Sequence, residues 1–288
     1  MQRVPALLAL AMSAILVACE ENSCEGAQCS AAAFGEFSFH GSSPNLNKRD
    51  LEYAAGLNEF WEESPGQPID KLRSFTKFVP RTDLARFLVK YELFTKIVDV
   101  HGVIVECGVH MGGGLMAWAQ LSALLEPINH LRRVYGFDTF GPGFVEERTN
   151  EAKGDALPWR GFLQTGEGVV RHLERAVKLY DVNRYISHVP KVELVPGDIT
   201  LTAPEFVEKN PHLVVSLLYL DVDHYEPTKA ALEAFLPRMP KGGVIVFDEL
   251  NIKEWAGETM AVLDVLGISN LRIRRFPFNP QISYAVIE

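Results

Sequence analysis

The sequence VIVECGVHMGGG, residues 103–114, decides the fold of this chain. Its β-branched apolar residues lead into Glu106, a glycine-rich turn follows, and an apolar pattern with helical spacing runs from Leu115 to Leu125. A strand, a glycine-rich turn and a helix in this order bring the backbone close to a ligand at the carboxyl end of a parallel strand. The acid precedes the first glycine, so the spacing is not that of a G-x-G-x-x-G motif. A tight turn that needs glycine for its backbone conformation is the alternative interpretation.

Strand and helix patterns alternate after this turn, which predicts an α/β protein with a Rossmann-like, doubly wound sheet. The segment 214–221 is almost wholly apolar, as expected for a central parallel strand that is buried on both faces. The last two predicted strands are separated by residues 277–281, too few for a crossover helix, so the last strand should be antiparallel. The strands are predicted at 103–107, 133–138, 191–195, 214–221, 243–248, 271–276 and 282–287, and the helices at 114–125, 167–179, 203–209, 226–238 and 254–266.

Two helices are predicted before the sheet. Residues 51–63 show helical spacing of apolar residues, and a second helix should begin at Thr82 or Asp83, either of which suits an N-cap. We therefore expect an N-terminal helical segment at 51–101 and the sheet-containing domain at 102–288. The apolar stripe of the second helix comprises Leu84, Phe87, Leu88, Tyr91, Phe94 and Ile97.

The start of the chain has a different composition. An apolar run at 4–17 has the length of a signal-peptide core and is short for a membrane-spanning helix of about 20 residues. It ends at Cys19 in a sequence that resembles a bacterial lipobox, so we expect a leader at 1–19. The polar stretch at 20–50 is predicted to be a disordered linker.

The length, charge and cysteine content of the chain limit the classes of function that it can have. The chain has 288 residues, 47% of them hydrophobic, which is enough for one large α/β domain with an extension. The net charge is −9 and no run is rich in Lys and Arg, so we expect no nucleic-acid partner. Cys24 and Cys29 would pair only after export. Cys107 is predicted to be a small buried hydrophobe, because no sequence feature supplies it with a base.

Carboxylates follow nearly every predicted parallel strand. Ligands of open α/β sheets bind outside the carboxyl ends of the strands, so these side chains should lie together. Asp138, at the end of the second strand, is in position to accept hydrogen bonds from ribose hydroxyls, although dehydrogenases use the same device. Hard carboxylates beside a cofactor suit Mg²⁺, and hydride transfer has no use for them. The series is Glu106, Asp138, Asp198, Asp221, Asp223, Asp248 and Glu249, with Asp221, Asp248 and Glu249 as the expected metal ligands.

These motifs together resemble the macrocin O-methyltransferase (TylF/MycF) family of class I S-adenosylmethionine (SAM) methyltransferases. The segments that carry the resemblance are ECGV at 106–109, GFDTF at 136–140, LDVDHYEPT at 220–228, GG at 242–243 and FDE at 247–249. The similarity covers roughly residues 75–288, and the pattern D-x-D-x-Y-x-x-T is its most specific part. The fifth strand of the family usually ends in Asp-Asp-Tyr. This chain has Asp248-Glu249-Leu250 instead, and the longer Glu side chain alters the details of coordination.

The resemblance implies a SAM-dependent O-methyltransferase, assisted by Mg²⁺, that acts on a hydroxyl of a sugar or nucleotide-sugar of deoxyhexose type. Such an enzyme holds the acceptor oxygen in line with the methyl group, and a bound metal lowers the pKa of the hydroxyl. Asp223 and His224 are the nearest candidates for the general base, with His110 as a third. The implied catalytic residues are Asp221, Asp223 and His224, and the implied cofactor-binding residues are Glu106, Gly108, Val109, Gly112, Gly113, Asp138, Thr139 and Asp198.

The segment 139–165 is a long polar connection. Connections of this length inside a compact domain are usually functional or disordered, and we interpret this one as a lid over the acceptor. Its Arg148, Lys153 and Arg160 would contact the phosphate groups of a nucleotide-sugar.

Two other function classes stay open on the sequence alone. One is an NAD-dependent oxidoreductase on the same sheet, and the other is a non-catalytic exported lipoprotein that binds a ligand. SAM use favours a cytoplasmic location, whereas the leader favours membrane attachment through Cys19. The acceptor and the oligomeric state do not follow from the sequence.

Overall fold

The computed structural model describes residues 48–141, 165 and 168–288, and the chain divides after Val79 into two compact units. None of the helices in this described part combines the length and the hydropathy that a membrane span needs. Several predicted features lie outside the described residues: the leader, most of the linker and of the 139–165 segment, Cys19, Cys24, Cys29, Arg148, Lys153 and Arg160.

The first unit contains short helices. Helix α2 spans Lys48–Glu63, which confirms the helix predicted at 51–63, and α3 spans Pro68–Arg73. A 3₁₀ turn, η2, follows at Phe75–Lys77. The ring of Phe78 packs against Phe60 and Trp61, with centroids 5.3 and 4.9 Å apart. Phe60 and Trp61 of α2 therefore have an aromatic partner within this unit, although both stay exposed.

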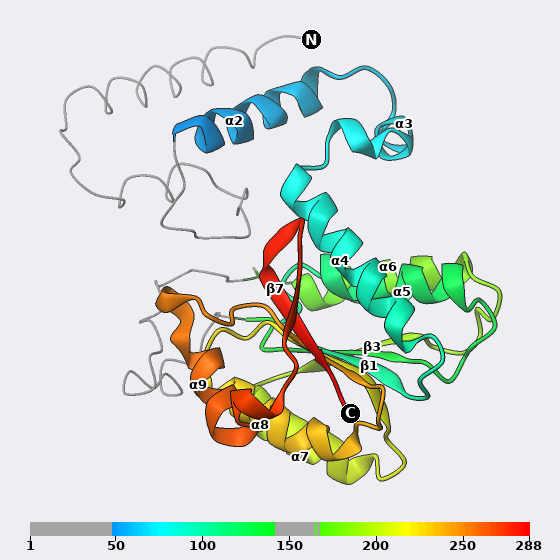
Figure 1. The fold of residues 1–288 in the computed structure, drawn as a ribbon. Coiled ribbons are helices and arrows are strands. Elements are labelled where there is room, and N and C mark those ends of the chain that lie inside the picture. The colour runs from blue at the N-terminus through cyan, green and yellow to red at the C-terminus, as the bar shows by residue number, and fades with distance from the viewer. Residues whose placement is uncertain (1–47, 142–164, 166–167) are drawn as a thin grey trace. The chain divides into compact units, whose positions relative to one another are not determined.

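The second unit is built on a mixed sheet in the order β3-β2-β1-β4-β5-β7-β6 (Figure 1). The first five strands of the chain pair in parallel, and β7 runs antiparallel to both β5 and β6, which confirms the predicted fold class and the antiparallel last strand. The strands are β1 (Val103–Cys107), β2 (Val134–Asp138), β3 (Val192–Pro196), β4 (Val215–Leu220), β5 (Val244–Phe247), β6 (Arg274–Phe276) and β7 (Asn279–Val286).

Helices cover both faces of this sheet (Figure 1). Side chains alternate along a strand, so Tyr219 of β4 belongs to one apolar core and Leu220 to the other. The helices of the first face are α4 (Arg81–Ile97), α5 (Gly113–Leu125) and α6 (Val169–Val182), and those of the second are α7 (Ile199–Lys209), α8 (Tyr225–Phe235) and α9 (Ala256–Val265). Short 3₁₀ turns are η5 (Leu236–Arg238), η6 (Lys253–Trp255) and η7 (Ile268–Asn270).

Helix α4 differs from its prediction in its start and in its domain. It begins at Arg81 with Pro80 as the N-cap, not Thr82 or Asp83, and Asp83 lies in the first turn, where a negative charge favours the helix dipole. It also belongs to the unit that contains the sheet. The boundary predicted between 101 and 102 therefore lies after Val79 in the structure.

The buried face of α4 is also rotated relative to the predicted stripe. Of the predicted residues, Phe94 and Ile97 are buried, whereas Phe87, Leu88 and Tyr91 are exposed. The actual buried face is formed by Val89, Lys90, Leu93, Phe94 and Ile97. The prediction failed because apolar residues occur on several sides of this helix, and the predicted stripe omitted the buried residues Val89, Lys90 and Leu93.

Arg132 joins several elements at the amino ends of the parallel strands. Its side chain is 3% exposed, and its Nε donates to Glu126 Oε1 at 2.6 Å. Its remaining nitrogens donate to Ser216 Oγ at 2.7 Å and to the backbone oxygens of Gly102, Ile97 and Val100 at 3.0, 2.9 and 3.0 Å. One guanidinium thus satisfies the end of α4 and ties it to β1 and β4.

We expect Arg132→Met to lower the free energy of unfolding by about 3–5 kcal/mol, because it leaves Glu126 and several carbonyls without their buried donor. Arg133→Gln is the control, since Arg133 forms a partly exposed pair with Glu193 at 2.8 Å. The control should cost less than about 1 kcal/mol. Urea denaturation measures both variants, and equal losses would contradict a structural role for Arg132.

Candidate functional site

Strained backbone marks one edge of the sheet. Among the described residues, those other than glycine with positive φ are His110, Phe140, Asp223 and Asn251, at 51°, 48°, 60° and 68°. They follow β1, β2, β4 and β5 in turn. Such conformations are unfavourable for residues with a Cβ and cluster at functional sites, where the surrounding structure enforces them. The carboxyl edge of the parallel strands is therefore the candidate site.

The glycine turn after β1 packs directly against the end of β4. Gly108 has φ of 89°, and a Cβ at this position would overlap the backbone oxygen of Asp221. The Asp221 N–H in turn donates to the backbone oxygen of Cys107 at 2.9 Å. Gly108, a predicted cofactor-binding residue, is thus required by this contact between two strand ends.

The start of α5 is open. Its N-cap, Gly112, adopts the left-handed conformation, and no side chain caps the helix. A Cβ built on Gly113 would meet no atom within 4 Å. Helix N-termini with backbone N–H groups beside open space accept anionic groups of ligands. Gly113 therefore borders an open cradle that suits the cofactor-binding role predicted for it, whereas Gly112 packs against Leu173.

Asp138 holds the glycine turn in place. Its Oδ2 accepts from the backbone N–H groups of Val109 and His110, both at 2.8 Å, and its Oδ1 accepts from the Phe140 N–H at 2.7 Å. Oδ1, which accepts a single one of these bonds, has acceptor capacity left for a ribose hydroxyl. Val109 is 4% exposed, and its predicted contact with a cofactor stays a prediction. Thr139 follows Asp138 at the same edge.

Glu106 is committed to an ion pair that the sequence did not indicate. Lys90 Nζ lies 3.0 Å from Glu106 Oε1, and both side chains are almost fully buried. The ammonium also lies over the rings of Trp118 and Tyr219, at 4.6 and 3.7 Å from their centroids. Burial raises the pKa of Glu106, although Lys90 lowers it. The feature of the sequence that could have indicated this pair is the position of Lys90 between the apolar residues Val89 and Leu93 on the buried face of α4.

Asp198 caps α7. Its Oδ1 accepts from the Thr200 N–H at 2.9 Å and from the Thr200 hydroxyl at 2.8 Å. This N-cap explains why α7 begins at Ile199, earlier than the predicted start at residue 203. The predicted contact of Asp198 with a cofactor stays a prediction.

The carboxylates of Asp221, Asp223 and Glu249 gather at this edge, with ligand atoms within 4.8 Å of one another. Oε1 of Glu249 accepts from Gln281 at 3.3 Å, whereas its buried Oε2 has no hydrogen-bond partner among the described residues. Desolvation and the neighbouring carboxylates raise the pKa values of Asp221 and Glu249 well above their usual range. An orphaned buried oxygen among crowded carboxylates suits a hard divalent cation.

Asp248, a predicted metal ligand, lies outside this group. Arg86 binds it through two nitrogens, at 2.8 and 3.2 Å. The Tyr219 hydroxyl and Gln281 Nε2 also donate to it, at 2.6 and 3.0 Å. Burial raises the pKa of Asp248, but Arg86 and Tyr219 outweigh it and hold the pKa below its ordinary value. The structure gathers Asp221, Asp223 and Glu249, and the predicted ligation by Asp221, Asp248 and Glu249 stays a prediction.

The side chains at the end of β5 alternate between the two cores of the sheet. Val246 faces the core under α4, and Phe247 faces the core under α9. Beyond the strand, Arg86 of α4 reaches the carboxylate of Asp248. On the α9 side, the buried Glu258 accepts from the Glu249 N–H at 3.0 Å. The two adjacent acids therefore have different neighbours in Arg86 and Glu258, although Gln281 Nε2 donates to both, at 3.0 and 3.3 Å.

Arg86 and Glu258 were missed by the sequence reasoning. Arg86 Nη2 also donates to Asp221 Oδ2 at 3.0 Å, so its guanidinium bridges the ends of β4 and β5. Burial by itself lowers the pKa of Arg86, but Tyr219, Asp248 and Asp221 raise it by more. The net pKa is therefore above its ordinary value, and the guanidinium is charged. Nothing local in the sequence distinguishes either residue from a surface charge.

The candidate bases differ in their surroundings. His224 is the N-cap of α8, is 2% exposed, and stacks on Trp255 with centroids 6.2 Å apart. Asp223 lies within the carboxylate group, and His110 belongs to the turn after β1. Cys107 is fully buried, and burial raises the pKa of its thiol well above normal, which agrees with the predicted inert role.

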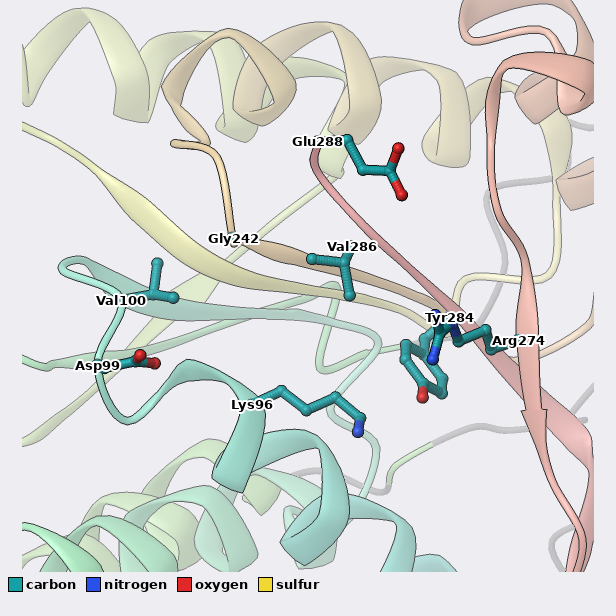
Figure 2. A pocket seen from close by; sticks show the side chains of 8 residues that line it. All are labelled: Lys96, Asp99, Val100, Gly242, Arg274, Tyr284, Val286 and Glu288. Carbon is teal, nitrogen blue, oxygen red and sulfur yellow. The ribbon is translucent and has the colours of Figure 1, made fainter.

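A separate pocket lies at the opposite end of the sheet (Figure 2). Its volume is about 440 Å³, and it is lined by residues from the end of α4, the start of β5 and the last strands. Lys96 lies over the ring of Tyr284, with its Nζ 5.2 Å from the centroid. The carboxylates described above lie at the carboxyl ends of the strands, so this pocket is not part of the candidate site.

Comparison with known proteins identifies similar chains. A family model described as "Methyltransferase domain" matches residues 105–250. The crystal structure of CalS11, calicheamicin methyltransferase, is 31% identical, with a TM-score of 0.79 over 92% of this chain and 99% of that one. Apo CalS11, described as TDP-rhamnose 3'-O-methyltransferase, is 31% identical, with a TM-score of 0.73 over 84% and 95%. The O-methyltransferase NovP shares the fold at 20% identity and a TM-score of 0.55, over 70% and 79%. No curated protein matches the chain.

We expect Lys90→Met and Glu106→Gln each to destabilise the protein, Lys90→Met by about 3–5 kcal/mol, because it leaves a buried charge without its partner. The double variant should recover a large part of this loss, since it removes both charges. Urea denaturation of the two single variants and the double variant measures the coupling. Additive losses would show that the two side chains act independently.

Proposed function

We propose that this chain methylates a hydroxyl of a sugar or nucleotide-sugar with the assistance of Mg²⁺. The premise is that the chain belongs to the methyltransferase domain family and is a SAM-dependent O-methyltransferase. The sugar acceptor is supported by the described activity of CalS11 on TDP-rhamnose and by its 31% identity. The segments that resemble the TylF/MycF family all lie within the matched residues 105–250.

The observation that carries the proposal is the contact between Gly108 and the backbone of Asp221. It brings the glycine turn, with its open cradle at α5, against the strand end that bears the carboxylate group. A methyl donor in the cradle and an acceptor at the carboxylates would therefore be neighbours. Methyl transfer depends mainly on such positioning of the acceptor oxygen in line with the donor.

The residues of the chain divide the work between them. Asp138 fixes the turn and offers its remaining acceptor capacity to the ribose of SAM, whose sulfonium carries an activated methyl group. Asp221, Asp223 and Glu249 would hold the divalent cation. A cation bound there would lower the pKa of the acceptor hydroxyl. Asp223 and His224, at the start of α8, are the candidates that accept its proton.

The two alternative functions, an oxidoreductase and a ligand-binding lipoprotein, have less support than methyl transfer. An NAD-dependent oxidoreductase has no use for the carboxylate group. The exported, ligand-binding lipoprotein rests on the leader, which lies outside the described residues. The cytoplasmic location expected from SAM use and the attachment through Cys19 both stay predictions.

We expect Asp138→Ala to weaken SAM binding by about 2–3 kcal/mol, because the variant loses the carboxylate that organises the turn and accepts from the ribose. Isothermal titration calorimetry with SAM measures the change. Glu193→Ala is the matched control, since Glu193 is an exposed carboxylate on the neighbouring strand β3. Unchanged affinity in Asp138→Ala would remove this residue from the cofactor site.

Chelation should abolish methyl transfer to the sugar acceptor, and added Mg²⁺ should restore it. Asp221→Asn should keep its shape, lose most of the activity, and retain SAM affinity within a few-fold, because the cofactor contacts lie at β1, β2 and α5. Activity assays before and after chelation, with calorimetry of SAM binding, test both statements. Full activity after exhaustive chelation would contradict the metal and leave the proposed sugar methylation standing.

A further inference from the structure

We infer that Arg86 is a built-in counter-ion of the site, which neutralises the carboxylates when no divalent cation is bound and competes with that cation for Asp221. The inference rests on the proposed metal-assisted function and adds to it a residue that sets the affinity of the site for the cation.

The geometry of Arg86 is that of a bridging cation. One nitrogen, Nη2, lies 2.8 Å from Asp248 Oδ1 and 3.0 Å from Asp221 Oδ2, and Nη1 lies 3.2 Å from Asp248 Oδ2. The fork on Asp248 fixes the plane of the guanidinium, which is the arrangement that arginine forms best with a carboxylate. The side chain is 22% exposed and that of Asp248 is 2% exposed, so the pair is largely withdrawn from water.

The same helix supplies two cations to this edge. Arg86 and Lys90 are one turn apart on α4, and Lys90 pairs with Glu106 at the end of β1. Lys90 is therefore already committed. Among the ion pairs of the described residues, those that reach Asp221 and Asp248 come from Arg86. Its single charge faces a larger group of acids that also contains Asp223, Glu249 and Glu258.

Asp221 is the point of competition. It belongs both to the ion pair with Arg86 and to the group of carboxylates whose ligand atoms converge. A cation held by Asp221 would lie close to the guanidinium, and like charges at such separations repel strongly in a partly buried site. Asp248, held through both of its oxygens, keeps Arg86 from moving away freely. Arg86 thus lowers the affinity of the site for the cation.

The test measures binding of Mn²⁺, as the probe ion, to the full chain. Titration followed by electron paramagnetic resonance of free Mn²⁺ compares the wild type with Arg86→Gln, Arg86→Lys and Arg133→Gln. Arg86→Gln should bind Mn²⁺ roughly tenfold more tightly than the wild type, because the repulsion is removed. Arg133→Gln removes the same charge from an exposed pair far from the site and should stay within about twofold of the wild type.

Arg86→Lys should lie between the wild type and Arg86→Gln, since lysine keeps the charge but not the fork. If Arg86→Gln does not fold, the Mn²⁺ affinity of Arg86→Lys is compared with that of the wild type instead. In a second measurement, Mg²⁺ should raise the melting temperature more in Arg86→Gln than in the wild type, because tighter binding to the folded state stabilises it more.

The outcomes separate this inference from the proposed function. Wild-type binding of Mn²⁺ with no tighter binding in Arg86→Gln or Arg86→Lys would overturn the role of Arg86 and leave the metal-assisted function intact. Weaker binding in both variants would also overturn it, and would show that Arg86 orients the ligands instead. No binding of Mn²⁺ by any of the proteins would overturn the metal assistance itself, and the inference with it.

Discussion

The concentration of negative charge at the carboxyl edge of the sheet is the constraint on which the rest of the site depends. Buried carboxylates are costly unless they are paired or hydrogen-bonded. Helix α4 meets this cost with Arg86 and Lys90, which reach the ends of β5 and β4 and the end of β1. The position of α4 over the sheet is therefore an electrostatic requirement as well as a hydrophobic one, and it explains why the buried face of this helix includes a lysine.

Backbone contacts connect the two halves of the site. Any side chain at Gly108 would overlap Asp221, so the glycine turn and the end of β4 are in direct backbone contact. Asp138 fixes the other side of the same turn through the N–H groups of Val109 and His110. A substitution in either place would change the cradle and the acceptor position together, which suits a reaction in which a small error in alignment is costly.

The adjacent acids Asp248 and Glu249 show how one strand end serves two purposes. Asp248 binds Arg86 and Tyr219, and Glu249 joins Asp221 and Asp223, while Gln281 donates to both acids. The longer side chain of Glu249, which departs from the pattern of the TylF/MycF family, lies in the group that would bind the cation. Its unpartnered Oε2 is the clearest sign within the described residues that this group is built to receive a ligand.

The sequence by itself determined the layout of this protein. Local periodicity and the apolar segment at β4 were enough to predict the alternating strands and helices, and the short link before β7 was enough to predict an antiparallel last strand, because these features depend on neighbours in the chain. The acids at the strand ends were likewise visible. Tertiary structure alone decided which acids meet. Arg86 lies 135 residues from Asp221 in sequence, and Glu258 reaches Glu249 from α9. Contacts of this kind depend on how a helix is rotated against the sheet, and an amphipathic pattern does not specify that rotation closely enough to predict the partner of a single charge.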